Sequence, residues 1–172
     1  MCSLLDDGNG YIISKSLKKS TKEDRKWAMD QNGYTIVDEN FKYKSRVTTV
    51  TVKDKAGKSR KLRQKSIVYW SRHFYERDVA EHKSFLEFIE KLKKSPDSFR
   101  VTKAQAGSLK KFMSKDIVNK ETGEVYDSRK LLGMIDNKKL EEFTELMGYY
   151  QIRTSEIDMD AREVIDKYHG LS

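Results

Sequence analysis

The chain has 172 residues and a net charge of +8, with 36% charged and 37% hydrophobic side chains. Cys2 is the only cysteine, which excludes an intramolecular disulfide and favours a reducing compartment. No stretch approaches the ~20 apolar residues that cross a bilayer, and the acidic start of the chain does not fit a signal peptide. We therefore expect a soluble, cytoplasmic protein without a membrane partner.

The first 40 residues are predicted to contain one strand and one short helix. Residues 11–16 have the pattern of a strand, and Gly8–Gly10 precedes them as a turn. Ser20 and Glu23 have the spacing of a capping box, which predicts a helix from there to about Met29. Asn32 and Gly33 would end it.

A β-hairpin is predicted next. Residues 41–52 are rich in aromatic and β-branched side chains, and Asp54–Gly57 has the composition of a turn. Residues 62–69 would form the returning strand.

The second half is predicted to be mostly helical. Ser71 is a plausible N-cap for a helix to about Lys94, with apolar residues at helical spacing and Ser95-Pro96 as its stop. Residues 119–124 have the pattern of a second hairpin turn, and Asp136 would cap a helix to about Met147. Residues 148–154 are predicted as a buried strand, followed by a helix that Asp160 and Glu163 open. This order of elements predicts an α+β fold.

Three familiar sites are disfavoured by their spacing. Ala56-Gly57-Lys58-Ser59 ends like a phosphate-binding loop, but the required first glycine is Val52 and a strand follows instead of a helix. The acidic residues between Glu156 and Glu163 lack the order of a calcium loop and fit helix capping. The three histidines are too far apart in sequence for a zinc pair on a helix.

The predicted hairpin is strongly basic. Between Phe41 and Lys65 lie ten Lys or Arg residues and one acid, Asp54. Because side chains alternate across a strand, one trio should share one face and a second trio should repeat the pattern on the returning strand, backed by apolar residues. Such a positive ribbon suits contact with nucleic-acid phosphates, and a solvated face that discourages aggregation is the alternative. The two trios are Lys42, Lys44, Arg46 and Lys61, Arg63, Lys65.

Several blocks of the chain resemble one protein family. The last 25 residues, from Gly148-Tyr149-Tyr150 to Ser172, are similar to the end of the catalytic domain in bacterial insertion-sequence transposases of the insertion-sequence-four type. In that family a buried strand leads into a helix with a Tyr-x-x-Arg-x-x-x-Glu signature. Tyr168 matches the Tyr, Leu171 stands at the Arg position, and the Glu would fall three positions beyond Ser172. Residues 10–16, 42–46 and 67–71 resemble the strand after the second catalytic Asp and the family's β-rich insertion.

The resemblance implies a partial RNase-H-like core with a β-rich insertion that carries the basic hairpin. Residues 1–30 would be a strand and helix of that core, 31–135 the insertion with the long helix, and 136–172 a core strand and a truncated helix leading to the catalytic Glu. In the family, three carboxylates bind Mg²⁺ and catalyse DNA cleavage and strand transfer. All three are expected outside this chain, so we expect no catalytic residue, metal site or cofactor in it and no DNA cutting by the chain alone.

The expected partner is double-stranded DNA at element ends, with full-length transposase or a second copy of the chain as further partners. The DNA-binding residues would be the two basic trios and Tyr168. Three alternatives stay open: a truncated product that binds DNA or inhibits the transposase, a decayed reading frame, and a stand-alone nucleic-acid-binding domain. RNA-binding signatures are absent from the sequence, which disfavours an RNA target.

Overall fold

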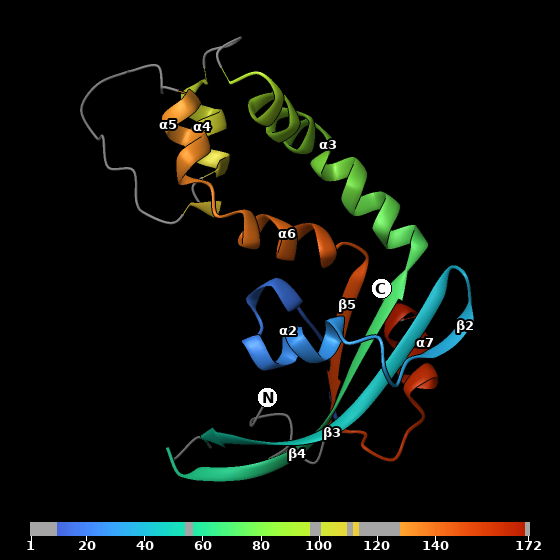
Figure 1. The fold of residues 1–172 in the computed structure, drawn as a ribbon. Helices are drawn as coiled ribbons and strands as arrows, with labels where there is room; N and C mark the ends of the chain where they lie inside the picture. The colour runs from blue at the N-terminus through green and yellow to red at the C-terminus, as the bar shows by residue number, and fades with distance from the viewer. Residues whose placement is uncertain (1–9, 54–56, 97–100, 110–111, 114–127, 171–172) are drawn as a thin grey trace. The chain divides into compact units, whose positions relative to one another are not determined.

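A computed structural model describes residues 10–53, 57–96, 101–109, 112–113 and 128–170. The chain divides into two compact units, one formed by residues 1–76 with 148–172 and the other by residues 77–147 (Figure 1). Helices and an antiparallel sheet are both present, which confirms the α+β class. Within the described ranges, no helix has the length and apolar character needed to span a membrane.

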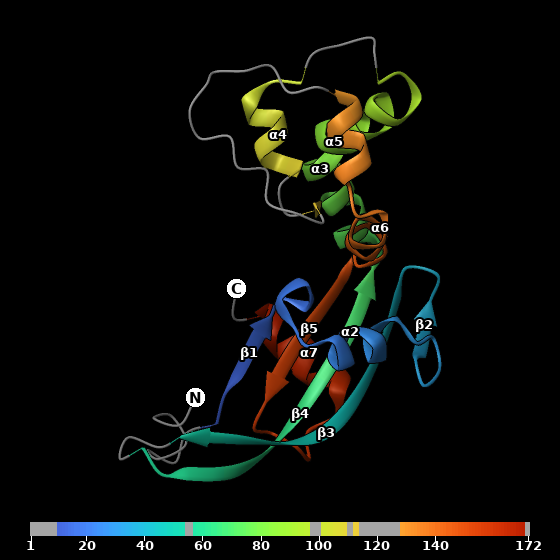
Figure 2. The same ribbon diagram turned by 60° about the vertical axis from the view of Figure 1, so that its left-hand side comes forward.

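The first unit is built on a five-stranded antiparallel sheet in the order β1-β5-β4-β3-β2 (Figure 2). β1 lies beside β5 although the two are far apart in sequence, with Ile12 opposite Thr154 and Lys15 opposite Gln151. The sheet therefore joins the two ends of the chain. The strands are β1 (Ile12–Lys15), β2 (Thr35–Asp38), β3 (Phe41–Lys53), β4 (Ser59–Ser71) and β5 (Tyr149–Thr154).

Each face of this sheet is covered by a different helix. Helix α7 (Ala161–Gly170) packs its buried Val164 and Ile165 against Ile67, Tyr69 and Ile152, and we call this side the α7 face. The 3-10 turn η1 (Leu17–Lys19) and helix α2 (Lys22–Met29) lie on the other side, the α2 face, where polar contacts of Ser20 and Asp24 accompany buried Leu17, Ala28 and Val68.

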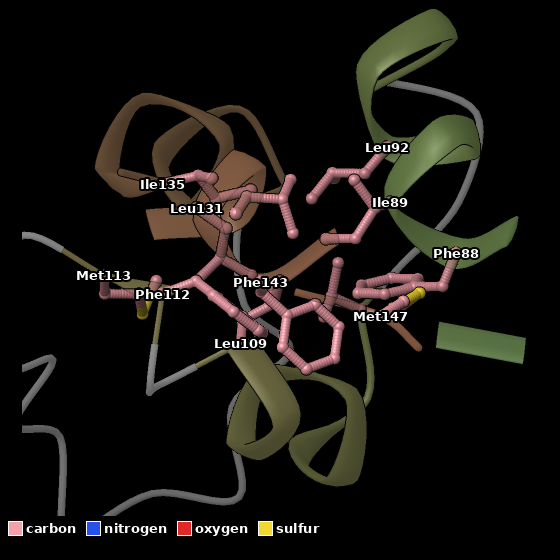
Figure 3. Packing of buried hydrophobic residues seen from close by; sticks show 12 residues of the cluster. Phe88, Ile89, Leu92, Leu109, Phe112, Met113, Leu131, Ile135, Phe143 and Met147 are labelled. Carbon is pink, nitrogen blue, oxygen red and sulfur yellow. The ribbon is translucent and has the colours of Figure 1, made fainter. Parts of the chain in front are cut away.

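The second unit is helical. It contains α3 (Arg72–Lys94) from Arg77 onward, α4 (Lys103–Leu109), α5 (Ser128–Met134) and α6 (Asn137–Glu145). Apolar side chains from these helices form its core, among them Leu92, Leu109, Leu131 and Phe143 (Figure 3). The predicted apolar stripe of α3 supplies its share, because Phe88, Ile89 and Leu92 are buried.

Most predicted elements are present, with differences at their ends. The side chains of Asp136 and Asp160 accept hydrogen bonds from backbone N–H groups at the starts of α6 and α7, as predicted for caps. The predicted cap of α2 is wrong by one residue, because Thr21 and not Ser20 accepts from the Asp24 N–H. β2 and α5 were not predicted, and the second hairpin turn at 119–124 lies outside the described residues.

The compact units do not follow the expected segments. Residues 31–135 were expected to form an insertion apart from the core, yet β2, β3 and β4 share one sheet with β1 and β5. The change of unit falls within α3, after Glu76. The basic hairpin is therefore continuous with the strands at both ends of the chain.

Candidate nucleic-acid interface

β3 and β4 extend beyond the rest of the sheet as a two-stranded ribbon. They pair along their whole length, from Phe41 opposite Ser71 to Lys53 opposite Ser59. β5 pairs with β4 only between Lys65 and Trp70. Residues 48–53 and 59–64 thus continue past the end of β5 (Figure 1), and we call them the β-ribbon.

The register places the two basic trios on opposite faces of the sheet. Lys44 lies opposite Val68 and Arg46 opposite Ser66, whereas Lys65 lies opposite Val47. Residues directly opposite each other in an antiparallel pair share a face. The two trios therefore do not form a single positive face. Lys42, Lys44 and Arg46 lie on the α2 face, and Lys61, Arg63 and Lys65 on the α7 face.

Lys44 is buried beneath the segment that follows α2. The residue is 5% exposed, and its Nζ donates to the carbonyl oxygens of Asp30 (2.5 Å) and Asn32 (3.3 Å). The ammonium also lies 4.5 Å from the ring centre of Tyr34. Burial lowers the pKa of Lys44. The nearby Asp30 opposes this shift, and repulsion from Arg46 and Lys42 adds to it. Lys44 therefore fixes the segment after α2 to the sheet and is not exposed to a ligand.

Asp24 joins α2 to two strands. Its two carboxylate oxygens accept from Arg46 at 2.7 Å and from Arg153 at 2.9 Å. The side chain of Asp24 is 11% exposed, and Arg46 stacks over Trp27 at 4.4 Å from the ring centre. Arg46 is thus engaged within the unit, as Lys44 is.

Lys42 is half-buried among aromatic rings. Its Nζ donates to Gln31 Oε1 at 2.6 Å and lies 5.2 to 5.8 Å from the ring centres of Tyr34, Tyr149 and Trp70. Such cation–π contacts stabilise a positive charge without a carboxylate. All three cations of the first trio therefore have partners on the α2 face.

The α7-face side of the β-ribbon presents its cations to solvent. Lys53, Lys61 and Arg63 are exposed, and the hydroxyl residues Thr49, Thr51 and Ser59 stand opposite them in the register. Same-face neighbours on one strand, such as Lys61 and Arg63, are about 6.8 Å apart. The other side of the β-ribbon carries half-buried Val50, Val52 and Leu62. A basic surface backed by apolar residues therefore exists, with a different membership from the predicted one.

Two predicted site residues lie beside this surface and are engaged in packing. Lys65, at the base of the β-ribbon, donates through Nζ to the Met159 carbonyl and lines a groove of about 480 Å³ with Tyr43 and Asp158. Tyr168 is half-buried on α7 and packs against the core of the first unit. The sequence analysis did not include Lys53 among the site residues. Lys53 shares a face with Thr49 and Thr51, and the register of the hairpin is needed to place it beside Lys61.

The hairpin strands have a uniform charge. β3 and β4 contain eight Lys or Arg residues and no Asp or Glu.

Across the residues whose placement is described, no three His, Cys, Asp or Glu side chains form a group that could hold a metal ion. No described residue is therefore assigned to a metal ion.

Ionisation of Tyr34 should lower the free energy of unfolding at alkaline pH. Its hydroxyl donates to the Ala28 carbonyl at 2.7 Å, and burial, aided by Tyr149 and Asp30, raises the pKa of this phenol. A raised folded-state pKa gives stability that is complete below the unfolded value of about 10 and is lost as the pH rises above it. From pH 10 upward, the ionisation of Tyr34 should lower the free energy of unfolding by up to about 1.4 kcal/mol per pH unit.

Urea unfolding of Tyr34→Phe between pH 8 and 11.5 measures this effect. At pH 8 the variant should be less stable by about 1 kcal/mol, because it lacks the hydrogen bond to Ala28. The deficit should shrink and reverse above pH 10. Tyr75→Phe, at an exposed ring, controls for the general alkaline loss, and a constant deficit of Tyr34→Phe at every pH would contradict the assignment.

Comparison of the chain with protein-family models, with curated proteins and with solved structures finds no match.

Proposed function

We propose that the chain binds double-stranded DNA through the α7-face side of the β-ribbon. The observation that carries this proposal is the row of exposed Lys53, Lys61 and Arg63, set among hydroxyl side chains on strands that contain no acidic residue. Lys and Arg neutralise phosphates and release their counterions, and hydroxyl groups donate to phosphate oxygens. The proposed contact is with the sugar–phosphate backbone and does not read the bases.

The shape of the β-ribbon favours a duplex over a single strand. A two-stranded β-ribbon fits the major groove of B-form DNA. Proteins that hold single strands use aromatic rings on which the bases stack. The residues of the β-ribbon include no aromatic side chain, so charge is the main attraction that it offers.

A salt titration of duplex binding tests the proposal. With fluorescence anisotropy on a labelled duplex, the logarithm of the affinity should fall against the logarithm of the salt concentration. Three phosphate contacts predict a slope of about −2.7, since each contact contributes roughly −0.9 on B-form DNA. A folded sample that fails to bind at low salt, or binds with a slope near zero, would refute the proposal.

We further propose that this binding serves a DDE-type transposase. The pairing of β1 with β5 supports the idea that the strands of residues 1–30 and 136–172 belong to one sheet, and the resemblance implies that this sheet is part of an RNase-H-like core. Cleavage and strand transfer would use carboxylates outside this chain, as the resemblance implies. The alternative is a non-catalytic DNA-binding product that occupies DNA or inhibits the transposase.

A nicking assay with Mg²⁺ separates the chemistry from the binding. We expect no nicking of supercoiled DNA by the purified chain in Mg²⁺, at concentrations where anisotropy shows it bound. A nick that EDTA abolishes would place catalytic groups within the chain and overturn this expectation, while leaving the binding proposal intact.

A further inference from the structure

The outer edge of β3 is open for most of its length. β2 pairs with β3 only near Phe41–Tyr43. From Lys44 to Lys53, no strand within the described parts of the chain pairs with this edge. Unpaired backbone N–H and C=O groups on such an edge are a template for another strand.

The composition of this edge favours strand pairing. Residues 47–53 read Val-Thr-Thr-Val-Thr-Val-Lys, six β-branched residues and one cation, without proline or glycine. Among the described side chains, four large hydrophobic ones are classed as exposed, and three of these lie on β2 and β3. They are Ile36 (73%), Val37 (51%) and Val47 (45%).

The edge is complementary to itself. If two copies pair antiparallel about Val50, Val47 lies opposite Lys53, Thr48 opposite Val52, and Thr49 opposite Thr51. No cation then faces a cation, and the Val50 side chains of the two copies meet at the two-fold axis. Like charges placed directly opposite would destabilise the pair, so this register avoids the main cost of joining two basic strands.

We propose that a second copy of the chain pairs with this edge, and that duplex DNA promotes the pairing. This inference rests on the proposed function. A two-fold axis perpendicular to the sheet keeps both α7 faces on one side, so a four-stranded ribbon would place Lys53, Lys61 and Arg63 from both copies against the phosphate backbone of one duplex, outside its major groove. Seven paired residues bury far less than the ~1,200 Å² of a stable protein interface. The DNA, which attracts both basic faces, supplies the remaining stabilisation.

Disulfide trapping tests the pairing. In a Cys2→Ser background, Val50→Cys places two thiols at the two-fold axis, while Leu62→Cys places them on β4, opposite Val50 within one chain and away from the edge. Under mild oxidation with a random-sequence duplex, Val50→Cys should form covalent dimers at least ten times faster than Leu62→Cys. Sedimentation of the wild-type complex should show two chains on one duplex.

The outcomes distinguish this inference from the DNA proposal. If Val50→Cys cross-links no faster than Leu62→Cys and the wild-type chain binds DNA as a monomer, the pairing is refuted and DNA binding stands. If Val50→Cys dimers form without DNA and the salt titration shows no binding, the pairing stands, but its promotion by DNA and the proposed function are both refuted.

Discussion

Replacing Asp24 with alanine should lower the free energy of unfolding by about 3 kcal/mol. The substitution removes the carboxylate that both Arg46 and Arg153 contact. The Nε atoms of both arginines are already buried without a hydrogen-bond partner in the described structure, so two guanidinium groups would lose their main acceptor. Removing one partner of a buried ion pair costs about 3–5 kcal/mol, and the partial exposure of Arg46 favours the lower end.

Urea unfolding monitored by tryptophan fluorescence measures this loss, because Trp27 lies on α2 beside Arg46. Asp166→Ala is the matched control, since it removes an Asp–Arg pair on the exposed side of α7. Exposed pairs contribute about 0–1 kcal/mol. Asp24→Asn keeps an acceptor oxygen and should fall between the two. Equal losses for Asp24→Ala and Asp166→Ala would contradict the role of Asp24 as the link between α2 and the sheet.

Neutralising the exposed cations of the β-ribbon should weaken duplex binding about 500-fold at 0.1 M salt. The variant is Lys53→Gln, Lys61→Gln and Arg63→Gln together. Each lost phosphate contact reduces the salt slope by about 0.9, which at this salt concentration corresponds to nearly tenfold in affinity. The three side chains are exposed, so the fold should be unaffected, and circular dichroism checks this.

A second triple variant controls for net charge. Lys83, Lys91 and Lys93 are exposed on α3, and changing them to Gln removes the same three positive charges from the other unit. This control should change the affinity by less than about threefold and leave the slope intact. Equal losses in the two variants would mean that the chain attracts DNA by its net charge alone.

The fold was largely readable from local patterns. A segment rich in β-branched and aromatic residues, followed by a turn composition, identified the hairpin, and helical spacing of apolar residues identified α3 up to its stop at Ser95-Pro96. Capping by Asp136 and Asp160 also followed from sequence, because it depends on groups only a few residues apart. β2 was missed because it has four exposed residues and takes its place by pairing with β3.

The site was less predictable because it depends on register. The cations Lys42, Lys44 and Arg46 have even numbers and pair with even-numbered positions of β4. The odd-numbered Lys61 and Arg63 therefore fall on the opposite face. A turn one residue longer or shorter would have reversed this, and sequence alone does not set that length. The burial of Lys44 was equally hidden, since its carbonyl partners come from residues 30 and 32.

The most direct test of the central claim compares two neighbouring cations on opposite sides of the β-ribbon. Arg60 and Lys61 are both exposed, and the register places Arg60 with Val52 on one side and Lys61 with Thr51 on the other. In a Cys2→Ser background, Arg60→Cys and Lys61→Cys each remove one positive charge and accept the same thiol-reactive photoprobe. We predict that irradiation with duplex DNA cross-links the probe at position 61 at least ten times more efficiently than the probe at 60. Equal cross-linking, or a preference for position 60, would contradict DNA binding by the α7-face side.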